Sequence, residues 1–308
     1  MRKILGPITL AILLFLAIIG YSKIVKSRLA HLSIHPPSNH HTSKHHGQYP
    51  DMSYDKIILL GDSLTDKALK PDGWGTLLAT EYSRRMDVIV RGFSGYSSLN
   101  LKFAVEPILR EVPSERIAIV TLLIGTNDYS IATDHQHVDV NDYQDNLVSI
   151  LDSIISYVPK AKILVLTPPP LGAHKYHNTH TYILENARIY RDACIKTVQE
   201  IQKKSSRNQQ NIQLLNLWDV LVSGIEYDKK EWDPASIVDL FYDTLHFSAK
   251  GNELFFGGVK EKINSAWPEM SAGRLPFKYP NPDVLPVAKS NDQEGMRKGL
   301  FANARKKE

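Results

Sequence analysis

The feature that most constrains the fold of this 308-residue chain is an alternation of strand-like and helix-like segments that begins at Tyr54. Short apolar runs rich in branched residues indicate buried strands, and longer segments with apolar residues three and four apart indicate helices. The predicted strands are residues 56–60, 87–91, 116–124, 161–167 and 212–217, and the predicted helices are residues 73–85, 98–110, 140–157, 181–204 and 249–264. Five such units predict an α/β domain of three layers, α/β/α, around a five-stranded parallel sheet.

Polar residues and glycines follow three of these predicted strands directly, and a fourth polar stretch precedes the last helix. The stretches are Gly61-Asp62-Ser63-Leu64, Gly92-Phe93-Ser94-Gly95-Tyr96, Gly125-Thr126-Asn127-Asp128 and Asp243-Thr244-Leu245-His246-Phe247-Ser248. In an open α/β sheet, ligands bind at the edge formed by the carboxyl ends of the strands. We therefore hypothesise that Ser63 is a nucleophile and that the other stretches supply its base and its oxyanion donors.

These four stretches resemble the ordered blocks of the GDSL, or SGNH, hydrolase family, whose second name is formed from one residue of each block. The matching residues are, in order, Ser63, Gly95, Asn127 and His246. Residues 91–96 and 246–251 are most similar to the isoamyl acetate-hydrolysing esterase branch. The resemblance spans about residues 54–280. It implies a flavodoxin-like body and a serine esterase that cleaves carboxylic esters, with short acyl groups such as acetate as the expected substrates.

The chemistry of ester hydrolysis gives each of these residues a role. A serine hydroxyl becomes a good nucleophile only when a base accepts its proton, and the imidazole of His246 is the candidate base. Asp243 lies three residues earlier, so in a helical turn its carboxylate could reach the imidazole and fix its tautomer. The resemblance assigns the oxyanion hole to the backbone N–H groups of Ser63 and Gly95 and to the side-chain amide of Asn127. It implies no cofactor and no metal.

Other interpretations of the same residues remain open. Gly95 could serve only as a turn former, Asn127 only as a helix cap, and His246 only as a structural histidine. Asp62 and Asp128 are expected to hold their loops rather than to react. Alternative functions are a non-catalytic binding protein on the same fold, a transacylase and a lysophospholipase.

A second serine, Ser94, is also a possible nucleophile, because Gly92-Phe93-Ser94-Gly95 almost matches the nucleophile-elbow motif G-x-S-x-G. The second glycine stands one position too early for that motif. The sequence therefore favours Ser63 over Ser94 as the nucleophile.

The N-terminus contains an uncharged, apolar segment, Ile4 to Ser22, whose length is close to the roughly 20 residues that a helix needs to cross a bilayer. We favour a retained single-pass membrane anchor over a cleaved signal peptide, because the segment is long for a signal and Gly20-Tyr21-Ser22 is a poor cleavage site. The anchor would place the chain on a membrane, with an endomembrane such as the ER as one option. Cleavage would instead give a secreted protein.

Composition divides the chain into four parts: an anchor or signal (1–28), a His- and Pro-rich linker (29–53), an esterase domain (54–270) and a Pro-containing, charged tail (271–308). Residues 1–50 carry a charge of +6 and residues 271–308 carry +4, so the total of +4 leaves −6 on residues 51–270. An acidic body argues against a nucleic-acid partner, and the expected partners are a small ester substrate and a membrane. Oligomeric state is left open.

The single cysteine, a histidine-containing loop and the C-terminal residues give three further expectations. Cys194 is the single cysteine, so no disulfide can form within the chain. The histidines His174, His177 and His180 indicate a surface or substrate-rim loop rather than a metal site. Residues 287–308 are expected to lack regular structure.

Overall fold

The computed structural model describes residues 51–172, 181–224, 226–228, 232–285 and 292–303. The predicted membrane segment, most of the linker and the loop with His174 and His177 lie outside the described residues. Among the helices within these ranges, none is long and apolar enough to cross a bilayer.

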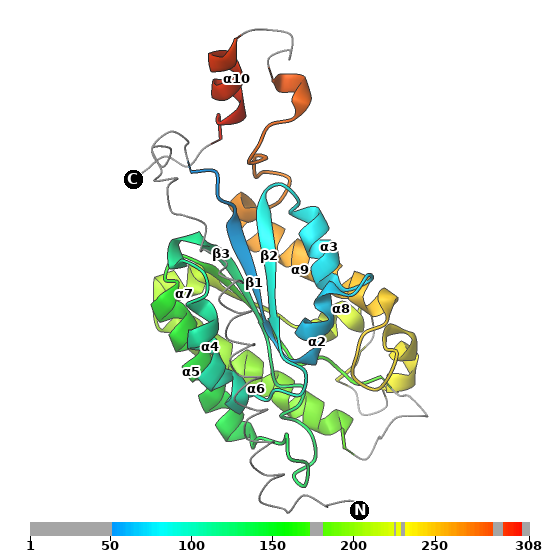
Figure 1. The fold of residues 1–308 in the computed structure, drawn as a ribbon. Helices are drawn as coiled ribbons and strands as arrows, with labels where there is room; N and C mark the ends of the chain where they lie inside the picture. The colour runs from blue at the N-terminus through cyan, green and yellow to red at the C-terminus, as the bar shows by residue number, and fades with distance from the viewer. Residues whose placement is uncertain (1–50, 173–180, 225, 229–231, 286–291, 304–308) are drawn as a thin grey trace, which may run out of the picture. The chain divides into compact units, whose positions relative to one another are not determined.

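The five predicted strands form one parallel sheet (Figure 1). The strands are β1 (Asp55–Gly61), β2 (Met86–Gly92), β3 (Ile117–Leu123), β4 (Lys162–Leu166) and β5 (Ile212–Leu215), and their order is β2-β1-β3-β4-β5. The chain moves outward from β1 to β2 and then crosses back to β3 on the other side of β1. This reversal next to β1 is a topological switch point, the place in an open α/β sheet where ligands bind.

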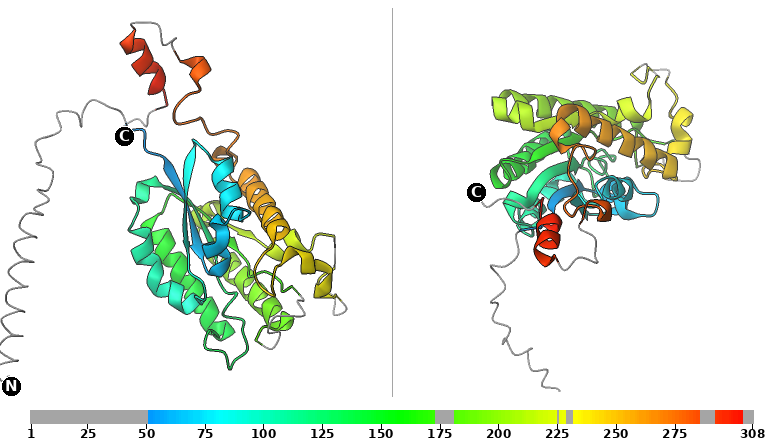
Figure 2. Two further views of the ribbon diagram at one scale, coloured as in Figure 1. Left: turned by 45° about the vertical axis from the view of Figure 1, so that its right-hand side comes forward. Right: turned by 90° about the horizontal axis from the view of Figure 1, so that it is seen from above.

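Helices cover both faces of the sheet and so confirm the predicted α/β/α layers (Figures 1 and 2). One face carries α4 (Ser98–Leu109), α5 (Val140–Tyr157) and α6 (Leu184–Lys203), and the other carries α3 (Trp74–Glu81), α8 (Leu217–Leu221) and α9 (Ala249–Ala266). The other α-helices of the described residues are α2 (Ser63–Asp66), α7 (Ser206–Asn211) and α10 (Gln293–Leu300). The 3₁₀ turns are Lys67–Leu69, Ser114–Arg116, Pro234–Leu240, Pro268–Met270 and Pro282–Val284.

The apolar pattern explains these layers. Residues 57–60 of β1 are buried on both sides, as a central parallel strand between two helical layers requires. Helix α5 buries a single stripe at helical spacing, formed by Tyr143, Leu147, Ile150, Leu151 and Ile154. Helix α9 begins where the side chain of Ser248 accepts a hydrogen bond from the N–H of Gly251.

Several boundaries differ from the sequence prediction. The strand predicted to reach residue 217 ends at Leu215, because the side chain of Asn216 caps α8 by accepting from the N–H of Trp218 at 3.2 Å. The helix predicted for 73–85 ends at Glu81, and Arg84 has a left-handed backbone with φ of 63°. The expectation of no regular structure after residue 287 was wrong for α10, whose start is capped by Asp292.

Part of the predicted tail packs against the α3–β2 connection. The guanidinium groups of Arg84 and Arg85 lie 4.4 and 4.1 Å from the centre of the Phe277 ring. The N–H of Lys278 donates to the carbonyl of Arg84 at 2.9 Å. Phe277 therefore contacts the body, whereas Val284, farther along the tail, is 67% exposed. The domain boundaries remain a prediction.

Candidate active site

Ser63 is the first residue of α2, directly after β1, and it is only 5% exposed. The side chain of Asp62 caps this helix by accepting from the N–H of Leu64 at 3.0 Å. The carbonyl of Leu64 in turn accepts from the indole of Trp74 at 3.0 Å. Gly61 permits this tight passage, since a Cβ there would lie 2.3 Å from the carbonyl oxygen of Leu123. The serine therefore sits at the start of a short helix that these contacts hold in place.

His246 lies in a loop whose ends are held together by a bridge between Phe241 and Phe247. The N–H of Tyr242 donates to the carbonyl of His246 at 3.0 Å across this loop. The expectation that Asp243 and His246 share a helical turn is therefore wrong. Instead, one oxygen of Asp243 accepts from the N–H groups of Leu245 at 2.7 Å and His246 at 2.6 Å. This turn, closed by the aspartate side chain, brings the carboxylate to the imidazole.

Ser63, His246 and Asp243 form a continuous hydrogen-bonded chain. The hydroxyl of Ser63 lies 2.8 Å from Nε2 of His246, and Nδ1 of the same ring lies 2.7 Å from Oδ2 of Asp243. A carboxylate can only accept a hydrogen bond, so in the neutral ring Nδ1 carries the proton and donates it to Asp243. Nε2 then carries the lone pair, which faces the hydroxyl of Ser63. This arrangement can move a proton from the serine to the imidazole.

The carboxylate of Asp243 is held ionised by its partners. Burial alone would raise its pKa, but the ring of His246 and the two backbone N–H groups lower the pKa to about 2. At neutral pH the group therefore carries the full negative charge that stabilises an imidazolium beside it.

Gly95 and Asn127 lie in the loops that follow the two strands beside β1. Gly61 pairs with Gly92 on one side and with Leu123 on the other, so the three loops start side by side at one edge of the sheet. Gly95 has φ of 84°, a conformation that favours glycine. The amide nitrogen of Asn127 donates to the carbonyl of Tyr96 at 2.8 Å. One amide hydrogen thus ties the two loops together and the second is left for a ligand.

Two further aspartates are buried beneath these loops. Burial raises the pKa of Asp62 to about 6 and that of Asp128 to about 7. Both oxygens of Asp128 accept from the N–H of Ser98 at 3.0 Å, at the start of α4. As expected, both carboxyl groups hold loops in place. Ser94 donates its hydroxyl to Asp66 and is not part of the chain formed by Ser63.

Two residues at the site were missed by sequence reasoning. Nζ of Lys67 lies 2.8 Å from Nε2 of His246, and the ring of Tyr242 stacks on the imidazole at 5.5 Å with an interplanar angle of 12°. Lys67 is 179 residues away from His246 in the chain, so no local pattern could have revealed the contact. Tyr242 adjoins Asp243, and that adjacency was its only available signal.

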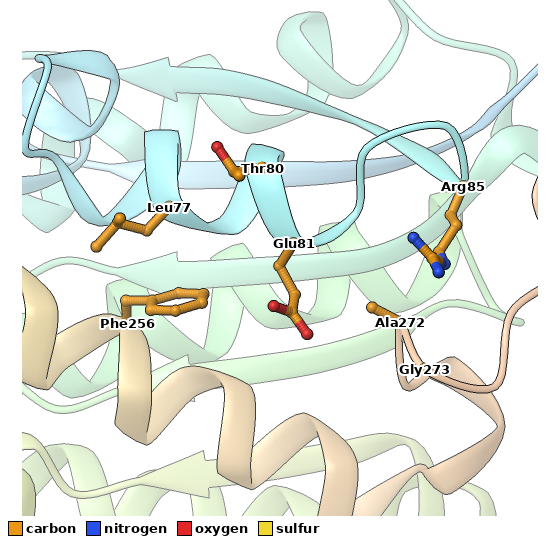
Figure 3. A pocket seen from close by; sticks show the side chains of 7 residues that line it. All are labelled: Leu77, Thr80, Glu81, Arg85, Phe256, Ala272 and Gly273. Carbon is orange, nitrogen blue, oxygen red and sulfur yellow. The ribbon is translucent and has the colours of Figure 1, made fainter.

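Other groups of the described residues are less suited to catalysis than the Ser63 site. Within the described ranges, no three His, Cys, Asp or Glu side chains gather as a metal site would require. Cys194 is buried, and burial raises the pKa of its thiol to about 12. A groove lined by Leu77, Glu81, Arg85 and Phe256 lies between α3, α9 and Ala272 (Figure 3). Arg85 immediately precedes β2, so this groove is at the opposite edge of the sheet from Ser63.

Known proteins resemble this chain over much of its length. The profile of the family described as GDSL-like Lipase/Acylhydrolase matches residues 57–259. A GDSL esterase/lipase of Arabidopsis thaliana is 28% identical over 241 residues, which cover 73% of this chain and 91% of that protein. A Mus musculus protein named isoamyl acetate-hydrolyzing esterase 1 homolog is 29% identical over 214 residues, which cover 65% of this chain and 78% of that protein.

Among solved structures, an acetyl xylan esterase has the same fold as this chain. Its TM-score is 0.51 at 19% identity, with 68% of this chain and 99% of that chain covered.

Proposed function

The chain belongs to the GDSL-like lipase and acylhydrolase family and is a carboxylic ester hydrolase, and on that premise we propose that it works through an acyl-enzyme on Ser63. The observation that carries this proposal is the chain of short contacts from Ser63 through His246 to Asp243. The matched family profile spans all three of these residues.

In the proposed acylation step, Oγ of Ser63 attacks the ester carbonyl while its proton passes to Nε2 of His246. The carboxylate of Asp243 stabilises the imidazolium that forms. The backbone N–H groups of Ser63 and Gly95 and the free amide hydrogen of Asn127 receive the negative charge on the carbonyl oxygen. When the carbon–oxygen ester bond breaks, the alcohol takes the proton from His246 and leaves.

Deacylation repeats these movements with water in place of the serine. His246 accepts a proton from the water as it attacks the acyl carbon, and the proton is then returned to Oγ of Ser63. The products are the carboxylic acid and the regenerated enzyme. A transacylase would differ only at this step, since an alcohol would replace water, and product analysis with a competing alcohol distinguishes the two.

We propose short acyl groups, acetate foremost, as the substrates. The names of the isoamyl acetate-hydrolyzing relatives support this choice. A hydrolysis panel that varies acyl length on a fixed alcohol tests it, with the highest kcat/KM expected for the acetyl ester.

The decisive experiment is Ser63→Ala, which removes the nucleophile. Turnover of an acetate ester should fall by about 10³-fold or more. Ser94→Ala is the matched control, because it removes a nearby hydroxyl that is hydrogen-bonded to Asp66, and it should keep activity within about tenfold. A serine-directed organophosphonate should label Ser63 and not Ser94. Near-normal turnover by the Ser63→Ala protein would contradict the proposal, and a protein without labelling or turnover would instead be a binding protein.

We also propose that the apolar segment Ile4 to Ser22 tethers the esterase to a membrane. Extraction of expressed full-length protein with alkaline carbonate tests this, since an anchored chain stays with the membranes. Recovery of a soluble chain that has lost its first residues would support secretion after cleavage instead.

A further inference from the structure

The position of Lys67 beside the proposed catalytic base is unusual. Nε2 of His246 has one lone pair in the plane of the ring, and two donors, Nζ of Lys67 and Oγ of Ser63, each lie 2.8 Å from it. A lysine bound there competes with the serine for the lone pair. Once the imidazole is protonated, the same ammonium group faces a like charge. In the free enzyme, Lys67 therefore opposes the step that activates Ser63.

The nearby carboxylates already serve other groups. Asp62, Asp66 and Asp243 attract Lys67 electrostatically, but each accepts hydrogen bonds elsewhere: Asp62 from Leu64, Asp66 from Ser94 and Asp243 from His246. The carboxylate of Asp243 pairs with the imidazole of His246 at 2.7 Å instead. Burial and the charge of Lys70 lower the pKa of Lys67, against the attraction of these three carboxylates.

A second cation, Lys70, lies near Lys67 and Tyr242. Nζ of Lys70 lies 5.7 Å from the centre of the Tyr242 ring, and that ring stacks on His246. Tyr242 is 48% exposed and Lys70 is exposed, so this side of the site is open to solvent. Lys67 and Lys70 are two positive groups on this side of the site, where Asp62, Asp66 and Asp243 also act on Lys67. A negative group placed here would be attracted by both lysines.

The chemistry of the reaction decides which part of a substrate reaches Lys67. His246 must give its proton to the oxygen of the departing alcohol, so that oxygen lies next to Nε2 during acylation. The acyl carbonyl oxygen lies instead toward the proposed oxyanion donors Gly95 and Asn127. A group that contacts Lys67 is therefore attached to the alcohol part of the ester, a few bonds from the ester oxygen.

We propose that Lys67 selects esters whose alcohol part carries a negative charge, either a carboxylate or a phosphate, close to the ester oxygen. The anion draws the ammonium group away from Nε2, which frees the lone pair for Ser63 and leaves the protonated imidazole without a like-charged neighbour. Lys67 thus acts as a specificity-determining residue, and Lys70 adds a weaker attraction. This inference rests on the proposed function of Ser63 and His246.

The test compares acetate esters in matched pairs. Acetoxyacetate carries a carboxylate on the alcohol part, and acetoxyacetamide is its neutral counterpart of the same size. Acetoxyethyl phosphate and methoxyethyl acetate form the phosphate pair. Acetate release gives kcat/KM for each ester, and the ratio of charged to neutral ester is the readout. Comparing this ratio between proteins cancels the intrinsic reactivity of the esters.

In Lys67→Met, a side chain of similar length without charge, the ratio should fall by about tenfold or more in at least one pair, as expected when a charge-assisted hydrogen bond is lost. The neutral ester should be hydrolysed at least as fast as by the wild type, since the competing donor is gone. Lys67→Arg keeps the charge and should retain most of the ratio. The pair with the larger fall identifies carboxylate or phosphate as the preferred anion.

Lys70→Met is the matched control, because it removes an equal charge that does not contact His246. Its smaller effect should fade as salt rises above physiological strength, since exposed charges are screened. An acyl-side pair, monoethyl succinate and its amide, should respond less to Lys67→Met than the alcohol-side pairs. An unchanged ratio in both alcohol-side pairs, equal losses for charged and neutral esters, or a larger acyl-side effect would each overturn the inference.

The two levels of proposal fail in different ways. If the wild type cleaves none of the acetate esters, or if Ser63→Ala cleaves them equally well, the proposed function is wrong. If Ser63→Ala is inactive and the ratio nevertheless survives Lys67→Met, only the role of Lys67 is wrong.

Discussion

The loop that carries His246 and the loops that follow β1 and β3 each contain an aspartate with a shifted pKa, but the shifts have opposite directions. The pKa of Asp243 falls to about 2, whereas burial raises that of Asp62 to about 6 and that of Asp128 to about 7. Asp243 receives two backbone N–H groups and an imidazole that can become a cation. Asp128 receives neutral donors only, namely the backbone N–H and the hydroxyl of Ser98 and its own backbone N–H.

The difference has two causes: the side chain of Asp243 is 17% exposed whereas Asp62 and Asp128 are fully buried, and the partners of Asp243 favour its charged form. A carboxyl beside an ionisable ring remains charged and can stabilise charge on that ring. A carboxyl with neutral donors only is costly to ionise and serves best as a fixed hydrogen-bond acceptor. One region is thus suited to proton transfer and the other to holding loops, and the predictions that follow test this contrast.

The largest effect is expected for Asp243→Asn. The amide cannot carry the negative charge that stabilises the imidazolium, and it can favour the wrong tautomer of His246, so kcat should fall by about 10³–10⁴-fold. Asp128→Asn is the same substitution in the other region and should change kcat by no more than about tenfold. Steady-state kinetics on one acetate ester compare the two. Equal losses would break the contrast between the regions.

The next effect concerns Asn127, the proposed oxyanion donor in the loop after β3. Asn127→Ala removes the amide and should lower kcat by about 10²–10³-fold, because the lost hydrogen bond would form mainly in the transition state. The substitution also removes the tie to Tyr96, so circular dichroism should first show that the protein remains folded. A change in KM with kcat unchanged would argue against the oxyanion role.

The contrast also predicts opposite dependences of stability on acid. The pKa of Asp243 is lowered on folding, so ionised Asp243 stabilises the folded protein. This stabilisation is fully present above the unfolded pKa of about 3.9 and disappears as pH falls through about 2. Asp243→Asn should therefore flatten the loss of stability between about pH 4 and pH 2. Urea unfolding across this range measures the slope, and an unaltered slope would contradict the assignment.

The smallest effect is expected for Asp128, whose pKa is raised on folding. Between about pH 4 and pH 7 the folded protein holds this proton more tightly than the unfolded chain, so stability falls as pH rises through this window. Asp128→Asn cannot bind this proton. Relative to wild type, its free energy of unfolding should therefore increase by on the order of 2 kcal/mol between pH 5 and pH 8. Thermal unfolding at the two pH values tests this. A wild-type advantage that grows with pH would refute it.

The elements that local patterns describe were well predicted. The alternation of apolar runs and helical stripes gave all five strands and the five long helices within a few residues. Short elements were missed where side-chain caps decide the structure, as at Asn216 for α8 and Asp292 for α10. Caps are single residues without periodicity, so they compete poorly with longer signals.

The sequence by itself determined the α/β fold, the family and the position of Ser63, Gly95 and Asn127 at strand ends, because strand periodicity and motif order are local properties of the chain. Only the tertiary structure revealed the turn by which Asp243 reaches His246, the stacking of Tyr242 and the contact of Lys67 with the imidazole. These contacts form only when the folded domain brings distant segments of the chain together, such as those with residues 67 and 246. A contact across 179 residues is fixed by packing of the whole domain, and no neighbouring residues encode it.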